Sequence, residues 1–152
     1  MKKTVSLVLV LSMIAVAVIG FGAAANAQTL SNAEKALALI NAFATGDADM
    51  ARSLLAEDYI QHNLAYGTGA DAFVGSVEYL AFAEVKTTVN NIRAFEDGDK
   101  VFLQTVYNFA GAGEQVAFDI FRIDENGKIA EHWDVMETIA DPSTWQNQNG
   151  KF

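Results

Sequence analysis

The segment Val116 to Met136, with the sequence VAFDIFRIDENGKIAEHWDVM, contains two apolar-rich runs separated by the dipeptide Asn126-Gly127. Asn-Gly is the strongest short-range signal of a two-residue hairpin turn, because both central residues of that turn need positive φ. With these residues as the loop, Asp119 lies opposite Asp134 in an antiparallel hairpin. A four-residue loop would shift the partners by two positions and leave the two faces unchanged.

The two faces of this predicted hairpin differ in character. Strand side chains alternate between faces, so one face collects three ionisable residues among apolar ones, and the other is largely apolar. The first face contains Asp119, Phe121, His132, Asp134 and Met136, and the second contains Phe118, Ile120, Arg122, Glu131, Trp133 and Val135. The first face is the best candidate for a functional site in the sequence.

Three segments with helical periodicity precede the hairpin. They begin at Ser31, which forms a capping box with Glu34, and at the potential N-caps Asp47 and Asp71. We expect the first helix to end near Thr45-Gly46 and the second to run into Tyr59.

Strand-like segments follow the third helix. Residues 86–96 are rich in Thr, Val and Ile, and residues 100–110 alternate between apolar and polar side chains. With the hairpin, this order predicts an α+β domain in which three N-terminal helices pack on an antiparallel sheet of four or more strands.

The first 27 residues predict a secretory signal peptide. Lys2 and Lys3 precede the apolar run 5–21, and Ala25-Asn26-Ala27 fits a small-x-small cleavage site. The run is near the minimum membrane-spanning length of roughly 17 residues, so an uncleaved anchor is the alternative. Cleavage predicts an exported protein, periplasmic or secreted, with a domain at 28–140 and a polar C-terminal arm at 141–152.

Charge and composition exclude several classes of function. Without the two lysines of the leader, eight basic residues face 19 acidic ones, which is a net charge of −11. Such a surface repels phosphate backbones and anionic lipids, so neither nucleic acid nor a membrane is an expected partner after cleavage. The chain has no cysteine, which excludes disulfides, thiolate nucleophiles and Cys-based metal sites.

The apolar outer face of the hairpin predicts a partner. Helices can cover only one face of the sheet, and a half-exposed sheet does not need apolar residues on both faces. We therefore expect a homodimer through the outer face, at the residues Phe118, Ile120, Trp133 and Val135.

Three motifs resemble a known family. The segments Glu57–Asn63 (EDYIQHN), Asp119–Ile123 (DIFRI) and Gly127–Val135 (GKIAEHWDV) are similar to the SnoaL-like branch of the nuclear transport factor 2-like superfamily, which also includes ketosteroid isomerase. Leu64 stands where a proline is usual. The resemblance covers nearly all of the mature chain. It implies a cone-shaped α+β barrel with a pocket between the helices and the concave face of the sheet.

The resemblance also implies roles for pocket residues. It places Asp119 in an oxyanion site and lines the pocket with His132, Asp134 and Met136. In SnoaL-like polyketide cyclases, an acidic pocket residue is the acid/base for an aldol closure, and the motif position matches Asp134 first and Asp119 second.

The pairing of these carboxylates carries its own chemistry. Two opposed carboxylates in an apolar pocket cannot both ionise cheaply, so we expect a neutral acid beside a charged base. A protonated Asp119 would donate to an enolate oxygen while Asp134 moves a proton at carbon. The alternative is a structural pair that shares a proton. His132 would shuttle protons or hold a carbonyl, or is a satisfied core residue.

Further residues are expected to contact a substrate. His62 and Asn63 would lie at the pocket rim, with loop capping as the alternative for His62, and Phe121 and Met136 would line the wall. Two histidines and two aspartates can in principle bind zinc or iron, but the sequence has none of the short ligand spacings of such sites. We therefore expect neither a metal nor a cofactor.

The sequence thus predicts acid/base chemistry on a small hydrophobic carbonyl compound: aldol condensation, cyclisation or isomerisation. The alternative is a non-catalytic periplasmic protein that binds an apolar ligand in the same pocket. The sequence leaves open which of the two applies, and hence whether the protein is an enzyme.

Overall fold

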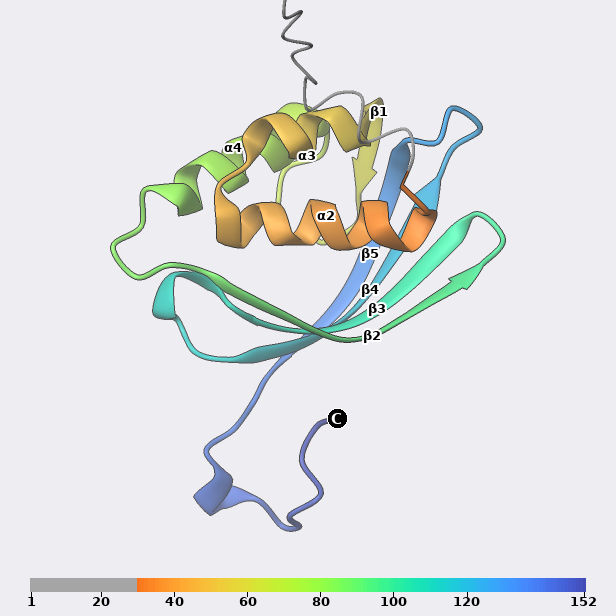
Figure 1. Cartoon of the computed structure of the whole chain (residues 1–152). Coiled ribbons are helices and arrows are strands. Elements are labelled where there is room, and N and C mark those ends of the chain that lie inside the picture. The colour runs from red at the N-terminus through yellow and green to blue at the C-terminus, as the bar shows by residue number, and fades with distance from the viewer. Residues whose placement is uncertain (1–29) are drawn as a thin grey trace, which may run out of the picture.

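The computed structural model describes residues 30–152, in which three α-helices cover one face of a curved sheet (Figure 1). The predicted signal peptide, with its alternative as a membrane anchor, lies outside these residues. Within residues 30–152, no helix combines the length and the apolar character needed to cross a membrane.

The first helix, α2 (Asn32–Thr45), begins and ends as its sequence predicts. The Ser31 hydroxyl accepts from the Glu34 N–H, and the Glu34 carboxylate accepts from the Ser31 N–H at 2.7 Å. These bonds satisfy backbone donors that a helix start otherwise leaves free. Gly46 ends the helix at φ 73°, a conformation that glycine adopts without steric cost.

The second helix is shorter than expected. Asp47 caps α3 (Ala48–Leu54) by accepting from the Met50 N–H at 2.9 Å, but the helix ends at Leu54 and strand β1 (Leu55–Gln61) follows. The prediction of a helix running into Tyr59 is wrong, because β1 pairs with the last strand of the sheet and that tertiary contact outweighs local helical periodicity.

The third helix, α4 (Ala70–Ala81), begins two residues earlier than predicted. Its N-cap is Gly69, which offers no capping side chain. The carboxylate of Asp71 instead pairs with Arg52 of α3 at 2.8 Å. The prediction that Asp71 caps this helix is therefore wrong.

The sheet contains β1 and four longer strands: β2 (Thr88–Asp97), β3 (Lys100–Asn108), β4 (Gln115–Ile123) and β5 (Ile129–Thr138). Their order is β1-β5-β4-β3-β2. β2 to β5 form the predicted antiparallel meander, whereas β1 is parallel to β5. The α+β class, the three helices and the curved sheet are confirmed, but the sheet is mixed and is not closed into a complete barrel.

The β4–β5 hairpin has the predicted register and a different turn. Asp119 pairs with Asp134. The loop contains five residues, 124–128, and of its residues only Gly127 has positive φ, at 72°. The predicted two-residue Asn-Gly turn is wrong: the Asp124 carboxylate accepts from two loop N–H groups, and a register shift after Arg122 absorbs the extra residues.

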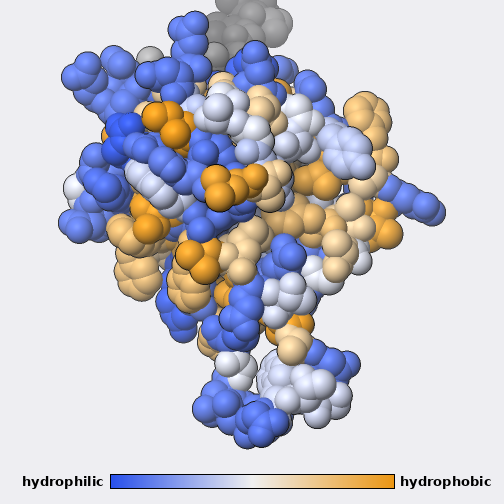
Figure 2. Space-filling model, turned by 180° about the vertical axis from the view of Figure 1, so that it is seen from behind, coloured by the Kyte–Doolittle hydropathy of each residue, from blue (hydrophilic) through white to orange (hydrophobic). Residues whose placement is uncertain are grey.

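The two faces of the sheet are distinct, as the alternation predicts. On the concave face, Asp119, Phe121 and His132 are buried beneath the helices. On the outer face, the side chains of Phe118 and Val135 are 57% and 72% exposed. The face drawn in Figure 2 shows hydrophobic side chains among hydrophilic ones at the middle of the molecule.

Residues 139–152 form an irregular arm after β5, on the side of the sheet away from the helices (Figure 1). A 3-10 turn at Pro142–Thr144 is its only regular element. The arm returns to the sheet at Lys151, whose carbonyl accepts from the Gln104 amide and whose ammonium pairs with Glu137 at 2.6 Å.

Candidate functional site

A pocket lies between the helices and the concave face of the sheet. It encloses about 440 Å³ of empty space, part of which is open to solvent. Apolar and aromatic side chains dominate its wall: Phe43, Tyr66, Phe73, Tyr107, Phe109 and Met136. Three larger polar side chains interrupt this surface: Gln61, His132 and Asp134. A mainly apolar cavity with a few convergent polar groups is typical of small-molecule sites.

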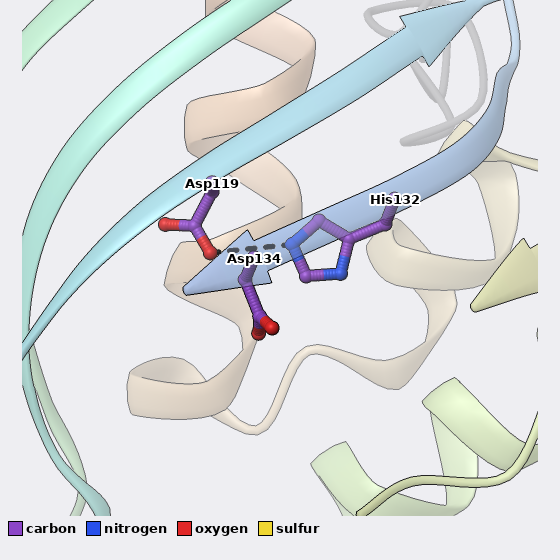
Figure 3. Close-up of side chains that lie close together, drawn as sticks. All are labelled: Asp119, His132 and Asp134. Carbon is purple, nitrogen blue, oxygen red and sulfur yellow. Dashed lines mark hydrogen bonds and ion pairs between the residues drawn. The ribbon is translucent and has the colours of Figure 1, made fainter. Parts of the chain in front are cut away.

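Strands β4 and β5 bring together the three ionisable residues of the hairpin (Figure 3). One ligand atom from each of Asp119, His132 and Asp134 lies within 4.8 Å of the other two. The Nε2 atom of His132 is 3.2 Å from Oδ1 of Asp119. His132 and Asp134 line the pocket, which agrees with the position that the sequence predicts for them.

Asp119 lies behind this wall. Its side chain does not line the pocket, and the residue is only 3% exposed. Both of its oxygens are occupied, since Oδ2 accepts from the Tyr107 hydroxyl at 2.9 Å and Oδ1 contacts His132. A buried carboxyl is tolerated when it is bonded in this way. The expectation that Asp119 donates directly to a substrate oxygen is therefore wrong, and Asp119 reaches the pocket through its partners His132 and Tyr107, which both line it.

The tyrosines around the carboxylates stay protonated. Burial raises the pKa of Tyr107 well above its usual range, and the nearby Asp119 raises it further. Burial and Asp134 raise the pKa of Tyr66 in the same direction, and burial with both aspartates does so for Tyr59. Low polarity and negative charge both disfavour a phenolate. The three phenols are therefore hydroxyl donors at neutral pH.

Asn63 holds the carboxylate of Asp134, which lines the pocket. Its Nδ2 donates to Oδ2 of Asp134 at 2.8 Å, and its Oδ1 accepts from the Ala65 N–H at 2.9 Å. Because a backbone N–H can only donate, it fixes which end of the Asn63 amide faces Asp134. Among the hydrogen bonds of residues 30–152, none involves Oδ1 of Asp134, so this oxygen is open to a ligand.

Two further predicted residues occupy the pocket region. Met136 lines the pocket, and its sulfur lies 3.9 Å from Nδ2 of Asn63. Phe121 lies beneath the wall, where its ring stacks on His132 at 4.4 Å between centroids. Phe121 supports the imidazole and does not line the pocket.

His62 lies outside the site. Its ring stacks on Trp133 at 4.8 Å between centroids, and its Nε2 is 2.8 Å from Glu131. Both of those residues belong to the outer face of β5. The prediction that His62 lies at the pocket rim is wrong, because side chains alternate along residues 61–63 and His62 points away from its two neighbours.

Gln61 and Tyr107 belong to the site but were not singled out from the sequence. The Gln61 Oε1 lies 3.0 Å from Nδ1 of His132, and Tyr107 holds Asp119. A signal for Gln61 was present, since it lies two residues before Asn63 and shares its face once the segment is known to be extended. Tyr107 lies on β3, where it pairs with Gln115 of β4, and no local sequence motif marks it as a site residue.

Glu131, His62 and Arg122 form a cluster on the outer face that makes the stability of the fold depend on pH. The Glu131 carboxylate accepts from His62 and from the Arg122 guanidinium, and these bonds hold its pKa below the ordinary value of 4.5. Because folding lowers the pKa of Glu131, its ionised carboxylate contributes its full stabilisation when the pH is above 4.5. This contribution is lost as the pH falls through the lower pKa of the folded state. We expect Glu131→Gln to reduce the loss of stability between these pH limits, as measured by urea midpoints.

The control for this prediction is Glu57→Gln, which changes an exposed carboxylate on β1. It should leave the pH profile as in the wild type. An unchanged profile in Glu131→Gln would contradict the assignment.

The pocket residues also bear on metal binding. Within the part of the chain that the structure describes, Asp119, His132 and Asp134 are the one group with metal-ligand spacing. The alternative set with two imidazoles does not assemble, because His62 is on the outer face. Both nitrogens of His132 and both oxygens of Asp119 already have protein partners.

Comparison with known structures identifies the fold. A protein of unknown function from Cytophaga hutchinsonii, described as NTF2-like, superimposes with a TM-score of 0.61 at 18% identity and covers 71% of this chain and 91% of its own. IdmH, a putative polyketide cyclase from Streptomyces antibioticus, gives 0.57 at 20% identity, with 71% and 93% covered. An LEH-like epoxide hydrolase of M. tuberculosis gives 0.61 at 18%, with 70% and 82% covered.

The sequence comparison is more specific. No curated protein sequence matches this chain. Residues 36–132, which run from within α2 through α3, α4 and the strands β1 to β4 to the start of β5, match the SnoaL-like domain. The protein therefore belongs to the SnoaL-like domain family and has the nuclear transport factor 2-like fold.

Proposed function

We propose that this protein is an exported, cofactor-independent acid/base catalyst that acts on a small hydrophobic carbonyl compound. The observation that carries the proposal is Asp134, whose Oδ1 is open in an otherwise apolar and aromatic pocket. A carboxylate in such surroundings is a typical arrangement for moving a proton at carbon.

The proposed reaction begins with proton abstraction. Asp134 takes a proton from the carbon next to the substrate carbonyl, and the C–H electron pair forms an enolate whose negative charge lies on oxygen. The protonated hydroxyl of Tyr66 lines the pocket and is available to donate to that oxygen. Asn63 holds the other carboxylate oxygen and thereby sets the direction of the open one.

The enolate has two outcomes. In an isomerisation, Asp134 returns the same proton to a different carbon. In an aldol condensation or cyclisation, the enolate carbon attacks a second carbonyl, and the proton held by Asp134 passes to the new alkoxide. Both outcomes balance without an oxidant, a reductant or a metal ion. IdmH, a putative polyketide cyclase, shares the fold and supports this class of reaction for the pocket.

Solvent exchange tests the proposal without knowledge of the natural substrate. The protein is mixed with 2-tetralone or cyclohexanone in D₂O, and NMR follows the replacement of the hydrogens next to the carbonyl. We expect exchange to be faster than in buffer alone. Binding of the ketones without faster exchange would favour the alternative, a non-catalytic protein that binds an apolar ligand.

We also propose that the outer face binds a second copy of the chain. The strand register places Phe95, Phe102, Ile120 and Trp133 in one row across β2 to β5, and the exposed Phe118 and Val135 lie in the next row. Exposed apolar side chains that adjoin one another across several strands are typical of an interaction surface. The same patch on two copies can bury itself around a two-fold axis.

Sedimentation measures the oligomeric state. We expect a dimer at micromolar concentration and a monomer for Phe118→Glu, because the charge would be buried at the contact. Phe82→Glu, at an exposed position beyond α4, is the control and should remain a dimer. A monomeric wild type would contradict the proposal.

A further inference from the structure

The amide of Gln61 has a fixed orientation. Its Oε1 accepts from the backbone N–H of Asn63 at 3.0 Å, and its Nε2 donates to the Tyr59 hydroxyl at 3.2 Å. If the amide were flipped, its NH₂ group would face the N–H of Asn63, and two donors would oppose each other. The carbonyl end of Gln61 therefore faces Asn63 and, on its other side, His132.

This orientation determines where His132 carries a proton. Nδ1 of His132 lies 3.0 Å from Oε1 of Gln61, and an amide oxygen can only accept. Nδ1 must therefore be an N–H donor. The imidazole is buried, at 6% exposure, and its ring is packed on Phe121, so the contact persists within a fixed ring position.

The other side of the ring then requires a second proton. Nε2 of His132 lies 3.2 Å from Oδ1 of Asp119, and without a hydrogen the two lone pairs would face each other. With Nδ1 already protonated, the bond is either Asp119 O–H to a neutral imidazole or an imidazolium N–H to a carboxylate. In both forms the pair contains the same two protons and has no net charge.

We propose that Gln61 is a positioning residue that holds His132 with a proton on Nδ1, so that Asp119 and His132 retain a second, shared proton beside Asp134. Without Gln61, His132 would satisfy Asp119 by placing its only proton on Nε2, and the pair would carry one negative charge. Gln61 thus keeps the Asp119–His132 pair neutral, and Asp134 alone supplies negative charge to the pocket wall.

This inference rests on the proposed function for its purpose but not for its test. A neutral pair behind the wall lets Asp134 act as a base without a second carboxylate charge nearby, and it keeps a proton in reserve next to the site. The protonation of His132 can be measured with no substrate present. Failure of ketone exchange would reject the catalysis, whereas an unprotonated Nδ1 would reject the role of Gln61.

The experiment is nitrogen NMR of the imidazole ring in ¹⁵N-labelled protein. The chain contains two histidines, so a His62→Gln background leaves His132 alone in the spectrum. In this background we expect Nδ1 to resonate in the protonated range. Gln61→Met, which removes the acceptor but keeps similar volume, should move Nδ1 to the unprotonated range and place the proton on Nε2.

Two further variants separate this role from a structural one. Gln61→Glu restores an acceptor for Nδ1 and should restore the protonated Nδ1 signal. Gln146→Met, on the exposed arm, should leave the His132 signals unchanged. An unprotonated Nδ1 with Gln61 present would overturn the proposal, and this measurement does not depend on how well any Gln61 variant folds. A protonated Nδ1 that persists in Gln61→Met would also overturn it.

Discussion

Replacement of Asp134 by asparagine is expected to slow the exchange of ketone hydrogens by about 10²-fold or more, the usual contribution of a general acid or base. Asparagine has nearly the same shape and can still accept from Asn63, but it removes the basic oxygen that faces the pocket. The rate is measured by NMR in D₂O at several ketone concentrations, so that binding and turnover are separated.

Asp58→Asn is the matched control, because Asp58 is an exposed aspartate on β1. It should exchange at the wild-type rate. Circular dichroism and the urea midpoint establish that both variants are folded. Unchanged turnover in Asp134→Asn would remove Asp134 from the mechanism and, with it, the observation on which the proposed function stands.

The largest effect on stability is expected for Phe121→Ala. Phe121 is 1% exposed on the concave face, and its ring supports His132. Truncating a buried phenylalanine removes apolar contacts and leaves a cavity, which together cost about 3–5 kcal/mol. We expect a large decrease in the urea midpoint, followed by tryptophan fluorescence, because small domains are stable by only about 5–15 kcal/mol.

Phe82→Ala removes the same side chain from a position that is 90% exposed. Its free energy of unfolding should stay within about 0.5 kcal/mol of the wild type, as is usual for surface substitutions. A loss in Phe82→Ala equal to that in Phe121→Ala would contradict the assignment of Phe121 to the buried core and of Phe82 to the exposed surface.

The sequence determined the faces of the hairpin more securely than its turn. Side-chain parity along β4 and β5 depends only on strand alternation, and it placed Asp119, His132 and Asp134 on one face correctly. The turn type was wrong because Asp124 organises a longer loop through its own carboxylate, which a dipeptide signal does not reveal. The register survived because a bulge absorbed the difference.

Depth within the fold could not be predicted in the same way. Alternation gives the face of a residue but not whether it reaches the cavity, so Asp119 and Phe121 were expected to line a pocket that they only support. Strand β1 was missed for a related reason. Its pairing partner β5 lies about 70 residues away, and no local pattern encodes a parallel pairing at that separation.

The extended segment from Gln61 to Asn63 belongs to both surfaces of the sheet. Gln61 and Asn63 contact His132 and Asp134, while His62 between them stacks on Trp133 and donates its backbone N–H to the carbonyl of His132 at 2.9 Å. The same three residues therefore connect Trp133 on the outer face with His132 and Asp134 on the concave face. A substitution of Trp133 on the outer face is therefore expected to reach the pocket through the backbone of this segment.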